Sequence, residues 1–304
     1  MIKRSLFFST PGSLRLQLRQ LVWKGEDGRS AQIPVEDIGL VLVESRQVSV
    51  TSALLTELGE AGATVIFCDA SHMPSASLLP MAGNTRSQSV LHLQIKMSAV
   101  KSDILWGQTV REKILNQAAV AFPYDRELAG KLREMAKTVK RGDPANLEAQ
   151  AARAYFSIFE KIGAEGFHRD PEGTMPNAAL NYGYAILRAA VARALVSSGL
   201  HCAIGIHHHN QFNPFCLADD LMEPYRPFVD RIILSNRELF WTDEDELTPL
   251  MKQALLSVAV TDVSIGKMTR PLMNALSLTS ASFVRVIGED GKGTIEYPKV
   301  PETL

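Results

Sequence analysis

Side chains that can bind a divalent metal gather in two nearby stretches of this 304-residue chain. One stretch holds the consecutive histidines His207 to His209, and the other is Asp219-Asp220-Leu221-Met222-Glu223. If the acidic stretch is helical, Asp220 and Glu223 lie three residues apart and share one face. Two carboxylates on one face repel each other unless a cation or a proton offsets their charge. Together with one histidine they would suit Mg²⁺ or Mn²⁺, which prefer oxygen ligands with at most one or two nitrogens.

Both stretches also have a purely structural explanation. Acidic residues near the start of a helix complement its dipole, and Asp219, Asp220 and Glu223 could do only that. Three adjacent histidines point in different directions in any regular structure, so they do not easily bind one ion together. A zinc site would instead need ligands at i and i+4 or at separated loop positions.

Glu148 is a third candidate ligand from a different part of the chain. It lies in the stretch Asn146–Arg153, on a helix face of small residues that could approach a ligand closely. A glutamate early in a helix is otherwise a partner of the helix dipole or a solvated surface residue. A metal site therefore requires three separate segments to meet around one cation.

The net charge of −1 gives no overall signal for a polyanionic partner, so nucleic acid would need a local basic surface. The best candidate is the stretch that ends shortly before Glu148. Its basic residues are Arg111, Lys113, Arg126, Lys131, Arg133, Lys137, Lys140 and Arg141. Such a surface would bind phosphates without reading base sequence and with strong salt dependence. The alternative is a solvated helix face.

The elements that must position these residues change character along the chain. In the first third, Leu14, Leu16 and Leu18 alternate with polar residues, which predicts a half-buried strand. Two short apolar runs, residues 38–43 and 64–67, predict buried strands. Residues 52–58 between them have helical spacing. Residues 71–87 hold two prolines, a Gly-Asn pair and several serines, which favours a linker or hairpin.

Beyond residue 87 the apolar spacing becomes helical. One helix is expected to begin with Leu91, Ile95 and Val100, and the others cover residues 104–120, 125–139, 146–162, 178–198, 217–233, 247–258 and 269–286. The helix over 217–233 should be interrupted or bent near its prolines. The tail from Gly288 to Leu304 is rich in glycine, proline and charge and is expected to be loose. The predicted fold class is α+β, with a small β-rich N-terminal domain and a larger all-α domain.

Composition agrees with an ordinary globular protein. Hydrophobic residues make up 46% and charged residues 21% of the chain. No stretch reaches the ~18 apolar residues needed to span a bilayer. The three cysteines are scattered and form no CxxC pair, which disfavours a disulfide framework and fits a reducing cytoplasm. We therefore expect a cytoplasmic protein with no membrane segment.

Four motifs, taken in order, resemble a known family. They are NLEAQAARAYF (146–156), PNAALNYGY (176–184), GIHHHNQFN (205–213) and LADDLMEPYRP (217–227). Together they resemble the CRISPR-associated integrase, the first of the numbered Cas proteins, and look most like its type II branch. The match covers essentially the whole chain.

The resemblance implies a fold and a site. The fold is an N-terminal β-sandwich-like domain that serves in dimerisation, here residues 1–84, followed by a helical catalytic domain, here residues 85–304. By motif position the catalytic residues are Glu148, His208, Asp220 and Glu223. The metal, Mg²⁺ or Mn²⁺, would be held by Glu148, His208 and Glu223, with Asp220 as the alternative to Glu223. His208 is preferred to its neighbours because its spacing to the acidic motif matches that of the family.

The implied activity is strand transfer during CRISPR adaptation, with associated DNA endonuclease activity. A 3′-hydroxyl of the incoming DNA attacks a phosphodiester at an end of the CRISPR repeat, and the metal stabilises the developing charge. The implied partners are double-stranded DNA, a second copy of the chain, and a small companion Cas protein that bridges two dimers. Two alternatives remain: a metal-dependent nuclease that only cuts, and a non-catalytic DNA-binding or scaffold subunit.

Overall fold

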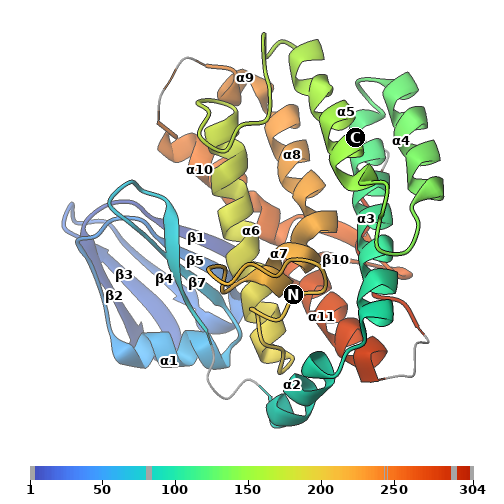
Figure 1. Cartoon of the computed structure of the whole chain (residues 1–304). Coiled ribbons are helices and arrows are strands. Elements are labelled where there is room, and N and C mark those ends of the chain that lie inside the picture. Colours follow the sequence, from blue (N-terminus) through green and yellow to red (C-terminus); the bar gives the residue numbers. More distant parts are fainter. Residues whose placement is uncertain (1–3, 80–83, 243, 245, 289–292, 302–304) are drawn as a thin grey trace.

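The computed structural model describes residues 4–79, 84–242, 244, 246–288 and 293–301. Figure 1 shows the N-terminal strands, with α1, on one side of the molecule and the other helices, with β10 among them, on the other side. The long helix α6 (Asn177–Ser197) runs beside the strands and contacts β7 (Thr64–Cys68) and β8 (Pro74–Leu78). The predicted order of a β-rich part followed by a larger helical part is confirmed.

The N-terminal part contains two four-stranded sheets. The first has the order β1-β5-β7-β8, in which β1 (Arg4–Phe8), β5 (Ile38–Val43) and β7 are parallel and β8 is antiparallel to β7. The second sheet has the order β4 (Ser30–Pro34), β3 (Gln20–Gly25), β2 (Gly12–Gln17) and β6 (Val48–Val50). Helix α1 (Ser52–Glu60) connects β6 to β7.

Strand β5 lies between two hydrophobic cores. Val41 and Val43 belong to the core between the two sheets, whereas Leu40 and Leu42 belong to the core shared with the helices. Successive side chains of a strand point to opposite faces, so an unbroken apolar run is expected where both faces are covered. All six residues of β5 are buried, which agrees with this pattern. The first sheet is therefore covered by the second sheet on one face and by helices on the other.

The remaining helices, shown in Figure 1, are α2 (Ser87–Ile95), α3 (Ala99–Ala121), α4 (Arg126–Thr138), α5 (Leu147–Lys161), α7 (Cys216–Met222), α8 (Arg226–Ser235), α9 (Arg237–Phe240), α10 (Pro249–Leu256) and α11 (Leu272–Gly288). The sequence predicts that Val100 continues the helix of Leu91 and Ile95. It lies instead in α3, because α2 ends at Ile95 and a new helix begins at Ala99. Among the described residues no helix combines the length and apolarity needed to cross a membrane.

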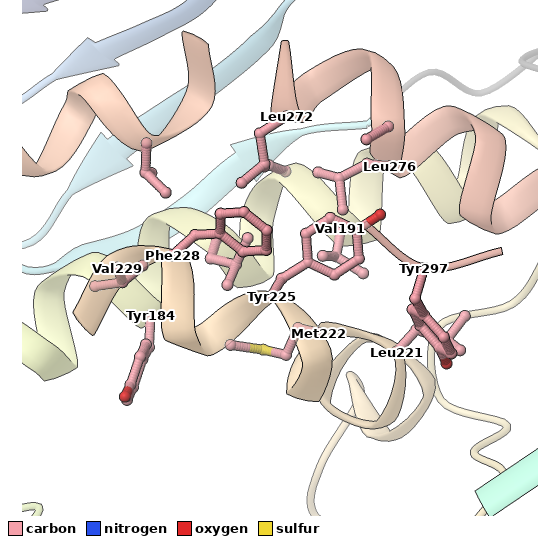
Figure 2. Packing of buried hydrophobic residues seen from close by; sticks show 14 of the residues in the cluster. Tyr184, Val191, Leu221, Met222, Tyr225, Phe228, Val229, Leu272, Leu276 and Tyr297 are labelled. Carbon is pink, nitrogen blue, oxygen red and sulfur yellow. The ribbon is translucent and has the colours of Figure 1, made fainter. Parts of the chain in front are cut away.

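The predicted bend over residues 217–233 is confirmed. A 3₁₀ turn, Glu223–Tyr225, separates α7 from α8, and a proline falls at the start of each of the two later elements. Proline lacks the N–H that would continue the preceding helix. Figure 2 shows the rings of Tyr225 and Phe228 directed into the core, near Val191 of α6 and near Leu272 and Leu276 of α11. These buried rings anchor the turn that carries Glu223.

The predicted helix over residues 269–286 is wrong at its start. Two strands, β9 (Asp262–Ile265) and β10 (Met268–Pro271), form an antiparallel hairpin before α11. Two residues connect the strands, and the first of them, Gly266, has φ 58°. Glycine adopts this conformation without steric cost and is favoured in two-residue hairpin turns. The second part of the chain is therefore helical apart from this hairpin.

The expectation of a loose tail is also wrong for the part of the tail that the structure describes. Ile295, Tyr297 and Val300 are buried, and the Lys299 N–H donates to the Ser264 carbonyl of β9 at 2.7 Å. These buried apolar residues anchor the stretch, although it also contains glycine and proline. Residues 289–292 and 302–304 of the predicted tail lie outside the described residues.

The predicted linker over residues 71–87 contains β8, which pairs with β7 as a hairpin. Residues 80–83 of this linker lie outside the described residues. The division into domains at residues 84 and 85 remains a prediction.

A buried ion pair joins the first sheet to the helices. Lys252 of α10 donates to Glu44, which directly follows β5, and both residues are buried. The ammonium also lies 5.9 Å from the centre of the Tyr182 ring of α6. Buried charges contribute to stability only as long as both partners are present.

We therefore predict that K252M lowers the free energy of unfolding by about 3 kcal/mol, because it leaves the Glu44 carboxylate buried without its main counter-charge. The double variant E44L/K252M should recover most of this loss, because it removes both charges. Urea denaturation of the two variants and the parent would measure the effect. A double variant no more stable than K252M would contradict it.

Candidate functional site

Segments that are distant in the sequence meet around one buried lysine. Glu148 lies in the first turn of α5, Glu223 begins the 3₁₀ turn, and Lys113 lies in the middle of α3. The Lys113 ammonium donates hydrogen bonds to Glu148 Oε1 and to Glu223 Oε2. Lys113 and Glu223 are buried, whereas the Glu148 side chain is 26% exposed. Two carboxylates predicted to share a cation therefore converge on a single positive charge.

A second cation, Arg226, completes the surroundings of Glu223. Its Nε donates to Glu223 Oε1 at 2.8 Å. Burial raises the pKa of the Glu223 carboxyl, but the positive charges of Arg226 and Lys113 outweigh this effect and lower the pKa to about 2. Burial likewise lowers the pKa of the Lys113 ammonium, and the charges of Glu223 and Glu148 more than reverse this, so that the pKa is raised. Both partners of this buried pair are therefore charged at neutral pH.

The start of α5 is held so that Glu148 has a defined direction. The Asp143 carboxylate accepts hydrogen bonds from the backbone N–H groups of Leu147 and Glu148, both at 2.9 Å. The residue before the helix, Asn146, has φ 51°. A carboxylate that accepts these otherwise unpaired N–H groups stabilises the first turn.

Asp220 organises the histidine loop. Its Oδ2 accepts hydrogen bonds from the N–H groups of Ile206 at 2.6 Å and of His207 at 3.0 Å. Its Oδ1 accepts from the His208 N–H at 3.3 Å and from His208 Nδ1 at 2.5 Å. The Asp220 side chain is completely buried. Both carboxylate oxygens are thus engaged by the histidine loop, which argues for a positioning role of Asp220.

The hydrogen bond to Asp220 also determines which nitrogen of His208 remains for a ligand. Because Nδ1 bonds the carboxylate, Nε2 is the nitrogen left for a metal, as in many carboxylate–histidine–metal arrangements. The same bond raises the pKa of His208. The charge of Glu223 acts in the same direction, and His208 in turn helps to lower the pKa of Glu223, so the two side chains are electrostatic neighbours.

The three histidines have different surroundings. The His207 ring stacks on the buried Trp106 of α3, with 4.2 Å between centroids and 2° between planes. The His208 ring meets the edge of the same indole at 5.8 Å and 84°. His209 is exposed. Of the three, His208 is the one that contacts Asp220 through its ring, which supports the choice made from motif spacing.

Gly205 allows the loop to approach Asp220 closely. A Cβ atom at this position would lie 2.4 Å from the His208 carbonyl oxygen and 2.8 Å from Asp220 Oδ2. Both distances are shorter than van der Waals contact, so any other residue would displace the loop.

The donor atoms suit a hard divalent cation, but their present geometry does not form a metal site. No group of three or more His, Cys, Asp or Glu side chains in the described part of the chain is arranged to hold a metal ion. The ammonium of Lys113 bonds both glutamates, Glu148 and Glu223. Two carboxylates and an imidazole nitrogen are nevertheless a donor set that Mg²⁺ and Mn²⁺ accept. The roles of Glu148, His208, Asp220 and Glu223 remain predictions.

Asp219, a candidate from the sequence, and two asparagines of the 176–184 motif have structural partners. Asp219 accepts hydrogen bonds from Arg188 Nε at 2.6 Å and from Asn213 Nδ2 at 2.7 Å, so it serves the local structure. Asn177 and Asn181 both accept hydrogen bonds from Arg169 of the loop before α6. The structural explanation therefore holds for these residues.

The predicted basic surface needs a correction, because Lys113 is not part of any surface. It is buried and bound to two carboxylates. On α4, Lys131 pairs with Glu127 at 2.7 Å and Lys137 with Glu134 at 2.6 Å, which reduces the net charge of that face. A local sequence window cannot distinguish a buried lysine from an exposed one, because its partners come from distant segments.

A second layer of polar groups supports Arg226. The Tyr184 hydroxyl donates to Asp230 Oδ1 at 2.5 Å, and the Arg226 guanidinium lies 4.5 Å above the centre of the Tyr184 ring. Asp230 is buried, and burial raises the pKa of its carboxyl to about 6 despite the hydrogen bond from Tyr184. This layer holds the guanidinium that keeps Glu223 ionised.

Sequence comparison places the chain in a class of CRISPR-associated proteins. The sequence matches a family of CRISPR-associated proteins over residues 6–262. The family is CRISPR associated protein Cas1, and the chain belongs to it. This confirms the family that the four sequence motifs indicated.

Curated relatives resemble the chain over most of their length. The CRISPR-associated endonuclease Cas1 of Neisseria meningitidis is 39% identical over 298 residues, which cover 98% of this chain and 96% of the relative. A CRISPR-associated endonuclease Cas1 of Francisella tularensis is 25% identical over 264 residues, with 80% and 81% coverage.

Solved structures share the fold at low sequence identity. A casposase bound to integration product has a TM-score of 0.78 at 18% identity, covering 100% of this chain and 96% of its own. A Cas1 protein from Thermotoga maritima has a TM-score of 0.71 at 16% identity, with 96% and 98% coverage. A Cas6-RT-Cas1–Cas2 complex has a TM-score of 0.71 at 18% identity and covers 100% of this chain and 36% of the solved chain.

Asp220 and Glu148 should differ in their effect on stability. We predict that D220A lowers the free energy of unfolding by at least about 2 kcal/mol, because it leaves several N–H groups without an acceptor. E148A should cost less than about 1 kcal/mol, because Glu148 is partly exposed and Lys113 keeps Glu223 as its partner. Urea denaturation of the metal-free variants would measure both. Equal losses would contradict the positioning role of Asp220.

The raised pKa of Asp230 predicts a pH-dependent effect on stability. The folded state favours the protonated carboxyl, so the contribution of Asp230 to stability declines as pH rises from its ordinary pKa of 3.8 through about 6. D230N lacks this titration. Its unfolding temperature relative to the parent should therefore rise over this range and stay level above it. D262N, at the exposed start of β9, is the control and should show no such trend. A constant difference between D230N and the parent from pH 4 to 8 would contradict the prediction.

Proposed function

We propose that this chain is a metal-dependent DNA integrase of CRISPR adaptation, which inserts spacer DNA into a CRISPR array and has associated endonuclease activity. The observation that carries the proposal is the convergence of Glu148 and Glu223 on one positive charge, with His208 held by Asp220 close enough to Glu223 for each to shift the pKa of the other. Membership of the Cas1 family and the relatives named as endonucleases support the same reading. The array lies in the cytoplasm, so the reaction is proposed to take place there.

In this proposal some residues bind the metal and others orient or charge those ligands. Glu148, Glu223 and Nε2 of His208 would hold Mg²⁺ or Mn²⁺, which when bound supplies stabilisation of the charge that develops on the phosphate. Asp220 orients His208 and keeps Nδ1 engaged. Arg226 keeps Glu223 ionised and therefore able to bind a cation.

The nucleophile of the proposed reaction comes from the substrate. A 3′-hydroxyl of the incoming DNA attacks a phosphodiester at the repeat end, and the 3′-oxygen of the cut strand leaves. The bond between the new strand and the phosphate replaces the one that breaks, so no covalent enzyme intermediate is required. If water replaces the hydroxyl, the same site hydrolyses DNA.

The proposed partners follow from this reaction. Insertion requires one attack on each strand of double-stranded DNA, and two sites at a fixed separation suit a symmetric homodimer. The solved relatives include a casposase bound to integration product and a complex of Cas1 with Cas2. They support the proposal of a DNA substrate and of a small companion Cas protein that bridges two dimers.

Joining of a 3′-hydroxyl duplex to a supercoiled plasmid that carries a CRISPR repeat tests the proposal. We predict that E148A and H208A each reduce the joined product by at least about a hundredfold, because each removes a group that supports the charge of the transition state. Chelation of divalent metal should have the same effect on the parent, and added Mn²⁺ should reverse it. E160A, an exposed change on the same helix, is the matched control and should retain joining.

The alternatives predict different products in this assay. A nuclease that only cuts would give fragments and no joined DNA in the parent. A scaffold subunit would bind duplex DNA equally well in the parent and in both variants and would give no product in any of them. Full joining by both E148A and H208A would contradict a catalytic role for these residues.

A further inference from the structure

Lys113 differs from the other buried lysine that is paired with glutamate. Lys252 pairs with one glutamate, Glu44, which His72 also contacts at 3.4 Å. Lys113 bonds two carboxylates from different segments, and one of them, Glu148, is partly exposed. A single ammonium therefore joins α3, α5 and the turn between α7 and α8, and of its two carboxylate partners Glu148 is the one partly exposed to solvent.

The oxygen atoms bound by Lys113 are those a metal would need. Glu148 Oε1 and Glu223 Oε2 both accept from the ammonium. Neither oxygen can be fully engaged by the ammonium and also lie in the inner shell of a small cation. A hard cation such as Mn²⁺ binds carboxylate oxygens directly. Occupation by lysine and occupation by metal therefore compete.

The charges lead to the same conclusion. Two carboxylates face two cations, Lys113 and Arg226, so the buried cluster is neutral as it stands. A divalent ion between the carboxylates would add two positive charges next to the ammonium. In a buried environment, where charges are weakly screened, like charges in contact are strongly unfavourable. Moving the ammonium away relieves this repulsion.

We propose that Lys113 is a built-in counter-cation of the metal site: it holds Glu148 and Glu223 together in the metal-free protein and must be displaced when a divalent metal binds. The inference rests on the proposed metal site. It assigns Lys113 a positioning role, because the ammonium acts on the ligands and not on the reacting DNA. It also accounts for the buried carboxylate of Glu223 and the partly exposed one of Glu148 remaining side by side before a metal binds.

Equilibrium binding of Mn²⁺ to the full chain, without DNA, tests this role by calorimetry. K113M keeps much of the side-chain volume but lacks the charge. We expect it to bind Mn²⁺ at least about tenfold more tightly than the parent, because the competing ammonium is gone. K252M is the matched control, since it makes the same change at a buried Glu–Lys pair elsewhere, and its Mn²⁺ affinity should equal that of the parent.

Thermal unfolding gives a second readout that does not depend on activity. Metal-free K113M should melt below the parent, because its two carboxylates lose their shared cation. Saturating Mn²⁺ should raise the unfolding temperature of K113M more than that of the parent. K113Q should behave like K113M, and it replaces K113M in both measurements if the methionine variant does not fold.

The outcomes separate this inference from the proposed function. Mn²⁺ binding to the parent with equal or weaker binding to K113M and K113Q would overturn the role of Lys113 and leave the metal site standing. Absence of Mn²⁺ binding in the parent and in both variants would overturn the metal site, and this inference with it. Tighter binding in the lysine variants, unchanged in K252M, would support both.

Discussion

The contact between one buried ammonium and two carboxylates is the interaction on which the proposed site depends. Lys113, Glu148 and Glu223 come from three separate segments, and none of these segments contains all the groups needed to bind a cation. Burial makes each charge unfavourable alone and the group of charges favourable together. The cluster therefore constrains the packing of α3, α5 and the turn before α8 as strongly as an apolar contact would.

Around this contact, other polar groups restrict movement of the ligands. Asp143 fixes the first turn of α5, and Asp220 ties the histidine loop to α7 through four hydrogen bonds. Trp106 supports the same loop from α3 through its stack with His207. The proposed ligands are thus oriented by the surrounding helices and by hydrogen-bonded partners, while Lys113 occupies the space between the two glutamates.

Much of the fold could be predicted from the chain, because strands and helices leave periodic apolar patterns. The buried strand β5 and the bend at the prolines before α8 are examples. The sequence does not reveal the hairpin before α11, because its strands have only four residues each. The helical spacing predicted over residues 269–286 also includes residues 269–271 of β10. The acidic and histidine motifs of the proposed site can be recognised in the sequence, but the burial of Lys113 cannot. Its partners lie 35 and 110 positions away, and no local pattern reports such contacts.

The strand covered on both faces has a consequence for any assembly of this protein. Leu40 and Leu42 are shared with the helices, while Val41 and Val43 are shared with the second sheet. Swinging the helical part away from the strands would bare an apolar surface to water, and the Glu44–Lys252 pair would have to separate as well. The shared core and the ion pair therefore oppose a hinge motion between the strands and the helices. In a dimer joined through its N-terminal strands, the span between the two reactive centres would be dictated by the shape of the protomer itself.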